Sequence, residues 1–242
     1  MIKSQLRVLK SQYEELQQVI AAVDQTVEPR AVTRFLNQAG LDLAKSMQEL
    51  APEDGYVLAA VANTEELQRE LQNEVIEGRV YRIRESDSQI ALTQSQLDKA
   101  ATVLTQQHST GAISPEELNT YKRHLMWAHL MLPTLSYVAQ GHQAISRSEY
   151  LPAKAFYQKA KVAVNNSNHP DPRRAQMVTE LTEIIERQRR SLSKEIMVET
   201  NFNPPPLVES GNTVDDQTEG TQSSSKSASN KKKKESASKK AP

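Results

Sequence analysis

The chain contains no cysteine among its 242 residues. Disulfide frameworks, thiolate nucleophiles and cysteine-ligated zinc sites are therefore excluded, and a reducing compartment is compatible with the composition. The first residues also lack the apolar stretch of a signal peptide, because Met1–Arg7 passes directly into an amphipathic pattern. No window approaches the roughly 20 apolar residues that a membrane span requires. We expect a protein with no membrane span that remains in the cytoplasm.

Glycine is also scarce, with seven residues in the chain. A phosphate-binding loop needs a glycine-rich turn after a strand, and the sequence shows neither that turn nor a convincing strand pattern. The five histidines form no helical metal-binding pair, since His124 and His129 are five residues apart and point in different directions on a helix. No nucleophile stands beside a general base. The sequence therefore predicts no catalytic residue, metal or cofactor, and a protein that is not an enzyme.

The chain also has no net charge, because its 30 basic residues balance its 30 acidic residues. This balance conceals a division at the C-terminal end. The segment 200–242 has few large apolar residues and is rich in proline, serine and lysine, so it cannot bury enough surface to offset chain entropy. We predict a disordered tail there, acidic in its first part and lysine-rich in its last.

The basic residues near the C-terminus suggest a partner of opposite charge. Those of the last predicted helix and of the tail form a candidate surface for an anionic partner such as nucleic acid, held by screened, sequence-independent attraction. The alternative is a solvating helix face and tail with no fixed partner. The residues of this candidate surface are Arg187, Arg189, Arg190, Lys194, Lys231, Lys232, Lys233 and Lys234.

Apolar residues in the first 23 positions alternate in steps of four and three through three heptads, which is the pattern of a helix seam. The seam consists of Ile2, Leu6, Leu9, Tyr13, Leu16, Ile20 and Val23. One interpretation is an ordinary helix that packs on the next helix of the same chain. The other is a coiled-coil helix that pairs with a second copy, which would make the protein a homo-oligomer.

Helical periodicity continues through most of the chain. Pro29, the Ala51–Asp54 segment and Asp171-Pro172 are helix starts, and Ser114 followed by Glu117 three residues later forms a capping box. Pro133 is expected to break or kink the helix that begins at Ser114. The predicted fold is all-α, with seven or eight stacked antiparallel helices. We divide it into an N-terminal helical region, 1–111, a second helical region, 112–199, and the tail, 200–242.

Bulky and small residues alternate at characteristic positions after Pro133. Small residues are needed where two antiparallel helices approach most closely, and aromatic residues fill the space beside them. The positions are Tyr137, Gly141, Ala144, Tyr150, Ala153, Tyr157 and Ala160. With this pattern the segment 134–167 resembles a single tetratricopeptide repeat. A generic helical hairpin with small interface residues is the alternative.

The resemblance implies a partner site and a capped end. In such repeats the first helix of each hairpin lines a groove for peptides or partner helices, and here it would present Leu135, Val138, His142 and Ile145. The helix after Asp171-Pro172 would cap the array, with apolar residues as far as Leu192. The alternative is that the same residues are packed under the neighbouring N-terminal helices.

These observations favour a non-catalytic protein interaction or scaffold module that binds a partner by helix packing or through a short groove. Two alternatives stay open. One is a nucleic-acid-associated protein that uses its basic last helix and lysine tail. The other is a self-assembling coiled-coil structural protein that uses the N-terminal seam.

Overall fold

The computed structural model describes residues 2–72 and 79–199, and these contain helices and no strand. The prediction of an all-α fold is confirmed for them. The predicted tail, 200–242, with Lys231, Lys232, Lys233 and Lys234, lies outside the described residues. The helices are α1 (Ile2–Thr26), α2 (Arg30–Leu50), α3 (Gly55–Glu70), α4 (Asp87–Ser109), α5 (Pro115–Ser146), α6 (Tyr150–Asn165) and α7 (Arg173–Ile185).

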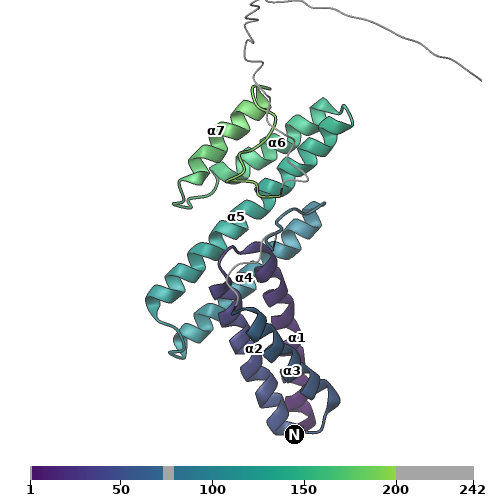
Figure 1. The fold of residues 1–242 in the computed structure, drawn as a ribbon, viewed down its shortest axis with the longest axis vertical. Coiled ribbons are helices and arrows are strands. Elements are labelled where there is room, and N and C mark those ends of the chain that lie inside the picture. The colour runs from purple at the N-terminus through teal and green to yellow at the C-terminus, as the bar shows by residue number, and fades with distance from the viewer. Residues whose placement is uncertain (1, 73–78, 200–242) are drawn as a thin grey trace, which may run out of the picture. The chain divides into compact units, whose positions relative to one another are not determined.

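Helices α1, α2 and α4, together with the first half of α5, pack around the C-terminal part of the α1 seam, and α3 packs on α2 (Figure 1). Leu16, Ile20 and Val23 are buried in one core cluster with Leu36 of α2 and Leu97 of α4. The seam is therefore occupied within the chain over this part. At its other end Ile2 is exposed, and Leu6 and Leu9 are only partly covered.

Helix α5 begins at the predicted capping box. The Ser114 hydroxyl accepts a hydrogen bond from the Glu117 amide at 3.2 Å, and the Ser114 amide donates to the Glu117 carboxylate at 2.9 Å. These two bonds satisfy backbone and side-chain groups that the first helical turn would otherwise leave unpaired. The predicted start of this helix is confirmed.

Pro133 does not end α5, which continues to Ser146, so the prediction of a break there is wrong. Proline has no amide hydrogen, so the carbonyl of His129 loses its partner four residues along the helix. Gln94 of α4 replaces it, since its Nε2 lies 3.4 Å from that carbonyl oxygen. A side chain from a neighbouring helix thus compensates for the missing hydrogen bond.

The second half of α5 packs with α6 and α7 around another core cluster. The segment 79–84 is not helical and crosses this region. Its Arg84 amide donates to the Ser136 hydroxyl of α5 at 2.9 Å, and Ile83 joins the buried cluster. Non-helical backbone can be covered here because α5 side chains supply hydrogen-bond partners.

Helix α7 ends at Ile185 and is shorter than predicted. Arg187 adopts a left-handed conformation with φ of 63°, the Gln188 amide donates to the Glu183 carbonyl, and the Arg187 amide donates to the Ile184 carbonyl. This pair of bonds is a Schellman motif, which terminates a helix. Leu192, predicted on the helix, lies beyond it and is buried after the chain turns back.

The same terminating motif closes α5, with Ser148 in the left-handed conformation. We expect Ser148→Gly to raise the free energy of unfolding by about 1 kcal/mol, because glycine adopts this conformation without a Cβ penalty. Thermal unfolding should show an increase of about 2–4 °C. Ser146→Gly, at a helical position of the same turn, should lower the unfolding temperature. Equal shifts in the two variants would contradict the explanation.

The described helices belong to one compact unit. The predicted division between 1–111 and 112–199 falls in the turn between α4 and α5 and stays a prediction. Within the ranges 2–72 and 79–199, no helix has both the length and the apolar character to cross a membrane.

Candidate functional site

A groove runs along α5 between α4 on one side and α6 on the other. It consists of two hollows of about 630 and 590 Å³ that share three lining residues, Gln94, Pro133 and Ala163. Helices α4 and α6 each pack on α5, so α5 forms the base between them. We call this continuous hollow the α5 groove. Each hollow has the size of an ordinary ligand-binding cleft.

The floor of the α5 groove is apolar. Leu97, Leu125 and Leu130 line it and are buried in the core clusters beneath, so their positions are fixed by packing. Two apolar side chains at its margins are accessible: Met126 of α5 is 54% exposed and Val162 of α6 is 56% exposed. The groove therefore combines a rigid apolar floor with exposed apolar margins.

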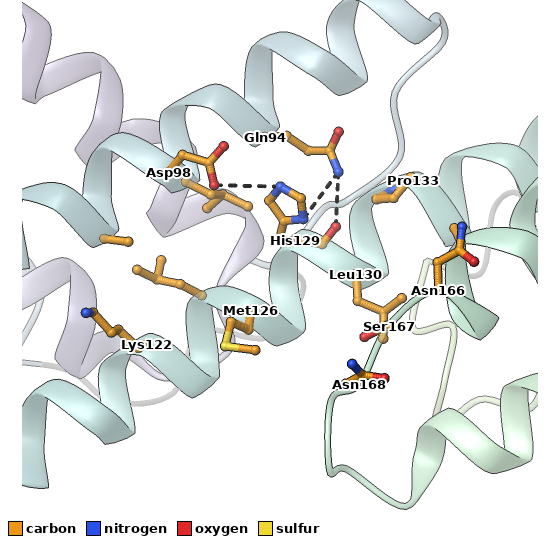
Figure 2. Close-up of a pocket in the computed structure, with 14 residues that line it drawn as sticks. Gln94, Asp98, Lys122, Met126, His129, Leu130, Pro133, Asn166, Ser167 and Asn168 are labelled. Carbon is orange, nitrogen blue, oxygen red and sulfur yellow. Dashed lines mark hydrogen bonds and ion pairs between the residues drawn. The ribbon is translucent and has the colours of Figure 1, made fainter.

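His129 lies on the α4 side of the groove, where Figure 2 shows it between two side chains of α4. Its Nε2 is 3.7 Å from the Asp98 carboxylate and its Nδ1 is 3.4 Å from the Gln94 carboxamide. Both side chains of the ion pair are well exposed, so the pair contributes little stability. Among the described residues, these are the polar side-chain contacts of His129. The Asp98 carboxylate and the Gln94 carboxamide thus orient the imidazole.

An ion pair connects α6 to the start of α4 at one end of the groove. The Lys159 ammonium is 3.2 Å from the Asp87 carboxylate and lies 5.1 Å above the centre of the Tyr137 ring. Partial burial, together with the hydrogen bond to Asp87, raises the pKa of Tyr137. The charge of Lys159 is therefore already engaged inside the protein.

The opposite wall is polar and comes from the end of α6 and the turn after it. Asn166, Ser167 and Asn168 line the groove there, and in Figure 2 Met126 of α5 lies between them and Lys122. Within the described part of the chain, the carboxamides of the two asparagines make no hydrogen bond and Lys122 makes no ion pair. These three side chains are available to a bound molecule.

A separate hollow of about 500 Å³ lies between α5, the turn before α2 and the start of α7. Its charged groups are mostly paired: Arg173 stacks on Trp127 at 4.3 Å and bonds to Asp171 and Glu28. The hydrogen bond from Arg173 holds the pKa of the Asp171 carboxyl below its usual value. The paired groups that line this hollow form a structural network that joins α5 to α7. Trp127 is buried.

His169 belongs to the same network. The Asp171 amide donates to its Nδ1 at 3.2 Å, so Nδ1 is unprotonated, and its Nε2 donates to the Arg123 carbonyl at 3.1 Å. Both ring nitrogens are therefore used in holding the turn before α7. No group of three or more His, Asp or Glu side chains in the described ranges is arranged to hold a metal ion.

The residues of the predicted repeat lie along the α5–α6 hairpin. Gly141 lies directly against the Tyr157 ring, and a Cβ added at Gly141 would be 2.4 Å from the ring carbon Cε1. Ala144, Ala153 and Ala160 are fully buried, as the close approach of two helices requires. Of the aromatic positions, Tyr137 is partly buried and Tyr150 is 54% exposed. The hairpin is present, and its assignment to the repeat family stays a prediction.

The predicted partner groove falls on a different face of α5 from the α5 groove. Leu135 and Val138 are fully buried in a cluster with Ile83 and Met177, so a partner cannot reach them without opening the core. His142 is partly buried, with Nδ1 2.8 Å from the Tyr157 hydroxyl, and Ile145 is exposed. Ile83 of segment 79–84 and Met177 of α7 share this buried cluster, so the face is packed within the chain, but not under the N-terminal helices that the sequence offered as the alternative.

Of the four described residues of the predicted anionic-partner surface, Arg187 and Arg189 are engaged within the protein, whereas Arg190 and Lys194 are exposed. Arg189 forms ion pairs with Glu180 and Glu183 at 3.7 and 2.7 Å, and the Arg187 guanidinium lies 5.2 Å above the Tyr150 ring. Arg190 and Lys194 lie beyond the end of α7. The predicted basic helix face does not exist as such, because α7 stops before all four residues.

The sequence pattern did not indicate the α5 groove. Its lining residues come from α4, α5 and α6, and Gln94 and Ala163 are almost 70 positions apart by their numbers. The one local signal was Pro133. Because Pro133 has no amide hydrogen, the His129 carbonyl accepts a hydrogen bond from Gln94 at the groove edge instead. Comparison of the chain with protein-family models, curated proteins and solved structures found no match.

Proposed function

We propose that this protein is a non-catalytic interaction module that binds a segment of a partner protein in the α5 groove. The observation that supports the proposal is a continuous apolar groove between three helices, with Met126 and Val162 exposed at its margins. Full burial of an apolar side chain of this size contributes roughly 1.5–3 kcal/mol, and since each of these two is about half exposed, covering it contributes roughly half of that. A few such contacts, reduced by the cost of association, suffice for a specific complex.

The helical hairpin of α5 and α6, which resembles one tetratricopeptide repeat, supports this proposal as the wall and base of the groove. The floor residues are fixed in the cores on both sides of α5, so the groove needs no rearrangement to accept a partner. Pre-organisation of this kind reduces the entropic cost of binding. The cytoplasmic location of the module is part of the proposal, because the sequence has no stretch of membrane-spanning length and its lack of cysteine is compatible with a reducing compartment.

Two variants on α6 test the groove. Val162→Glu places a charge at its margin, whereas Leu151→Glu places the same charge at an apolar residue that is 82% exposed and does not line the groove. Both sites are exposed, so both variants should fold, which circular dichroism can verify. In a pull-down from nuclease-treated lysate, we expect Val162→Glu to reduce recovery of the partner at least about tenfold and Leu151→Glu to preserve it.

Equal recovery with both variants would place the partner outside the α5 groove and overturn the proposal. Recovery of nucleic acid alone, lost after nuclease treatment or at raised salt, would favour the nucleic-acid-associated alternative instead.

A further inference from the structure

The polar groups of the α5 groove distinguish between the two common forms of peptide partner. A carboxamide carries both donors and an acceptor, so it can bond to a backbone N–H and C=O together. An extended peptide presents unpaired groups of both kinds along its length, whereas a helix satisfies its own groups internally. The side-chain carboxamides of Asn166 and Asn168, which make no hydrogen bond within the described part of the chain, therefore match an extended main chain. A helical partner would cover them and leave them unpaired, which is unfavourable.

One cation of the groove is left without a carboxylate partner. Lys159 is paired with Asp87 at 3.2 Å, whereas the Asp98 carboxylate lies on the α4 side, 3.7 Å from the His129 imidazole, which carries a charge only when it is protonated. Of the charged side chains that line the groove, Lys122 is left without an ion pair among the described residues. A carboxylate on the partner would complement it beside the apolar floor, where solvent screening is reduced.

The length of the groove sets the size of the segment. Lys122 and Tyr137 line its two ends on α5 and are separated by 15 positions, or about 22 Å at 1.5 Å per helical residue. An extended peptide advances about 3.3 Å per residue, so about seven residues fill this length. Alternate side chains of such a peptide face the floor, and the others face solvent.

We infer that the α5 groove binds an extended, mainly apolar peptide segment of about seven residues from a partner protein, with an acidic residue opposite Lys122. The inference rests on the proposed function and specifies the partner. The apolar side chains at alternate positions contact the floor, the carboxamides of Asn166 and Asn168 bond to the main chain, and Lys122 selects the charge.

The test uses the full chain as bait for a phage library of random peptides about 12 residues long, enough to span the seven that fill the groove. Enriched sequences are then synthesised with a fluorescent label, and their affinity is measured by polarisation. We expect apolar residues two positions apart and an aspartate or glutamate at one fixed position. The double variant Asn166→Ala, Asn168→Ala and the single variant Lys122→Glu should each weaken binding at least about tenfold.

Matched controls and a charge exchange sharpen the result. Asn165→Ala and Lys154→Glu alter exposed residues of α6 that do not line the groove, so they should leave the affinity unchanged. A peptide with lysine in place of its acidic residue should bind Lys122→Glu better than it binds the unaltered protein. Recovery of affinity when the two charges are exchanged requires that residue 122 and the exchanged peptide residue lie close together. A variant that failed to fold would not show it.

Three outcomes overturn the inference. Enriched peptides with apolar residues three and four apart, which become helical on binding and still require Val162, would retain the proposed function and exclude an extended partner. Peptide binding that Val162→Glu leaves unchanged would contradict both the proposed function and the inference of an extended peptide partner. Competition by a synthetic peptide of residues 200–212 with equal affinity would identify the chain's own segment as the occupant in place of a partner.

Discussion

Replacement of Arg82 by methionine is expected to lower the free energy of unfolding by about 3–5 kcal/mol. The Arg82 side chain is 1% exposed, and its Nε lies 3.3 Å from the Glu199 carboxylate, which is also buried. Its Nη1 lies 3.1 Å from Glu28, which in turn is 3.3 Å from Arg173. Removing the guanidinium leaves the Glu199 carboxylate buried without its partner, and an uncompensated buried charge is strongly destabilising.

Three further variants separate the effect of the unpaired buried charge on stability from the effect of lost packing. Glu199→Gln should lower the free energy of unfolding less than Arg82→Met does, because Arg82 keeps its ion pair with Glu28. The double variant Arg82→Met, Glu199→Gln should recover most of the stability that Arg82→Met loses. Arg84→Met is the matched control on the same segment, since Arg84 bonds to hydroxyl, carbonyl and carboxamide oxygens and to no carboxylate. Chemical denaturation measures all four. A double variant no more stable than Arg82→Met would show that the loss comes from packing.

The same network predicts a dependence on pH. Burial alone would raise the pKa of the Glu28 carboxyl, but the Arg82 and Arg173 guanidiniums more than offset it and hold the pKa below its ordinary value of 4.5. A lowered pKa in the folded state means that this contribution is fully present above 4.5 and is lost as the pH falls through the folded value. Glu28→Gln should therefore flatten the decline of stability below that pH, with little change in its slope near neutrality.

Gly141→Ala is the second large effect, with an expected loss of about 2 kcal/mol despite the higher helix propensity of alanine. The new Cβ would lie 2.4 Å from Cε1 of Tyr157 and 2.8 Å from Cδ1 and Cζ. The Tyr157 ring is buried and its hydroxyl bonds to His142 at 2.8 Å, so it cannot move aside freely. The α5–α6 hairpin must open slightly to admit the methyl group, which weakens packing along both helices.

A double-mutant cycle tests this explanation. Tyr157→Ala alone should cost about 3–5 kcal/mol through lost packing, but in that background Gly141→Ala should become neutral or stabilising by about 1 kcal/mol. Gly40→Ala in α2 is the control helix glycine, where the added Cβ would meet only side-chain atoms at 3.3 Å or beyond. It should stay within about 1 kcal/mol of the parent protein. If Gly141→Ala costs the same with and without the Tyr157 ring, the clash is not the cause.

Local signals in the sequence were sufficient for the helices and several of their ends. The Ser114 capping box needs only residues within one turn, so its bonds form wherever that helix forms. Periodic apolar residues identified the buried part of the α1 seam in the same way. The α7 terminus was placed too late, because a left-handed conformation at Arg187 is set by where the following chain, with Leu192, finds its place in the core.

The sequence alone therefore determined an all-α chain, its capping signals and the small residues of the hairpin, because each depends on neighbours three or four positions away. Only the tertiary structure decided which faces remain open. Leu135 and Val138 are covered by α7 and by segment 79–84, while Pro133 and Met126 border the α5 groove. Arg82 and Glu199 meet across 117 positions. Such contacts depend on how helices pack, and a local periodicity shows that a face is apolar without showing which helix covers it.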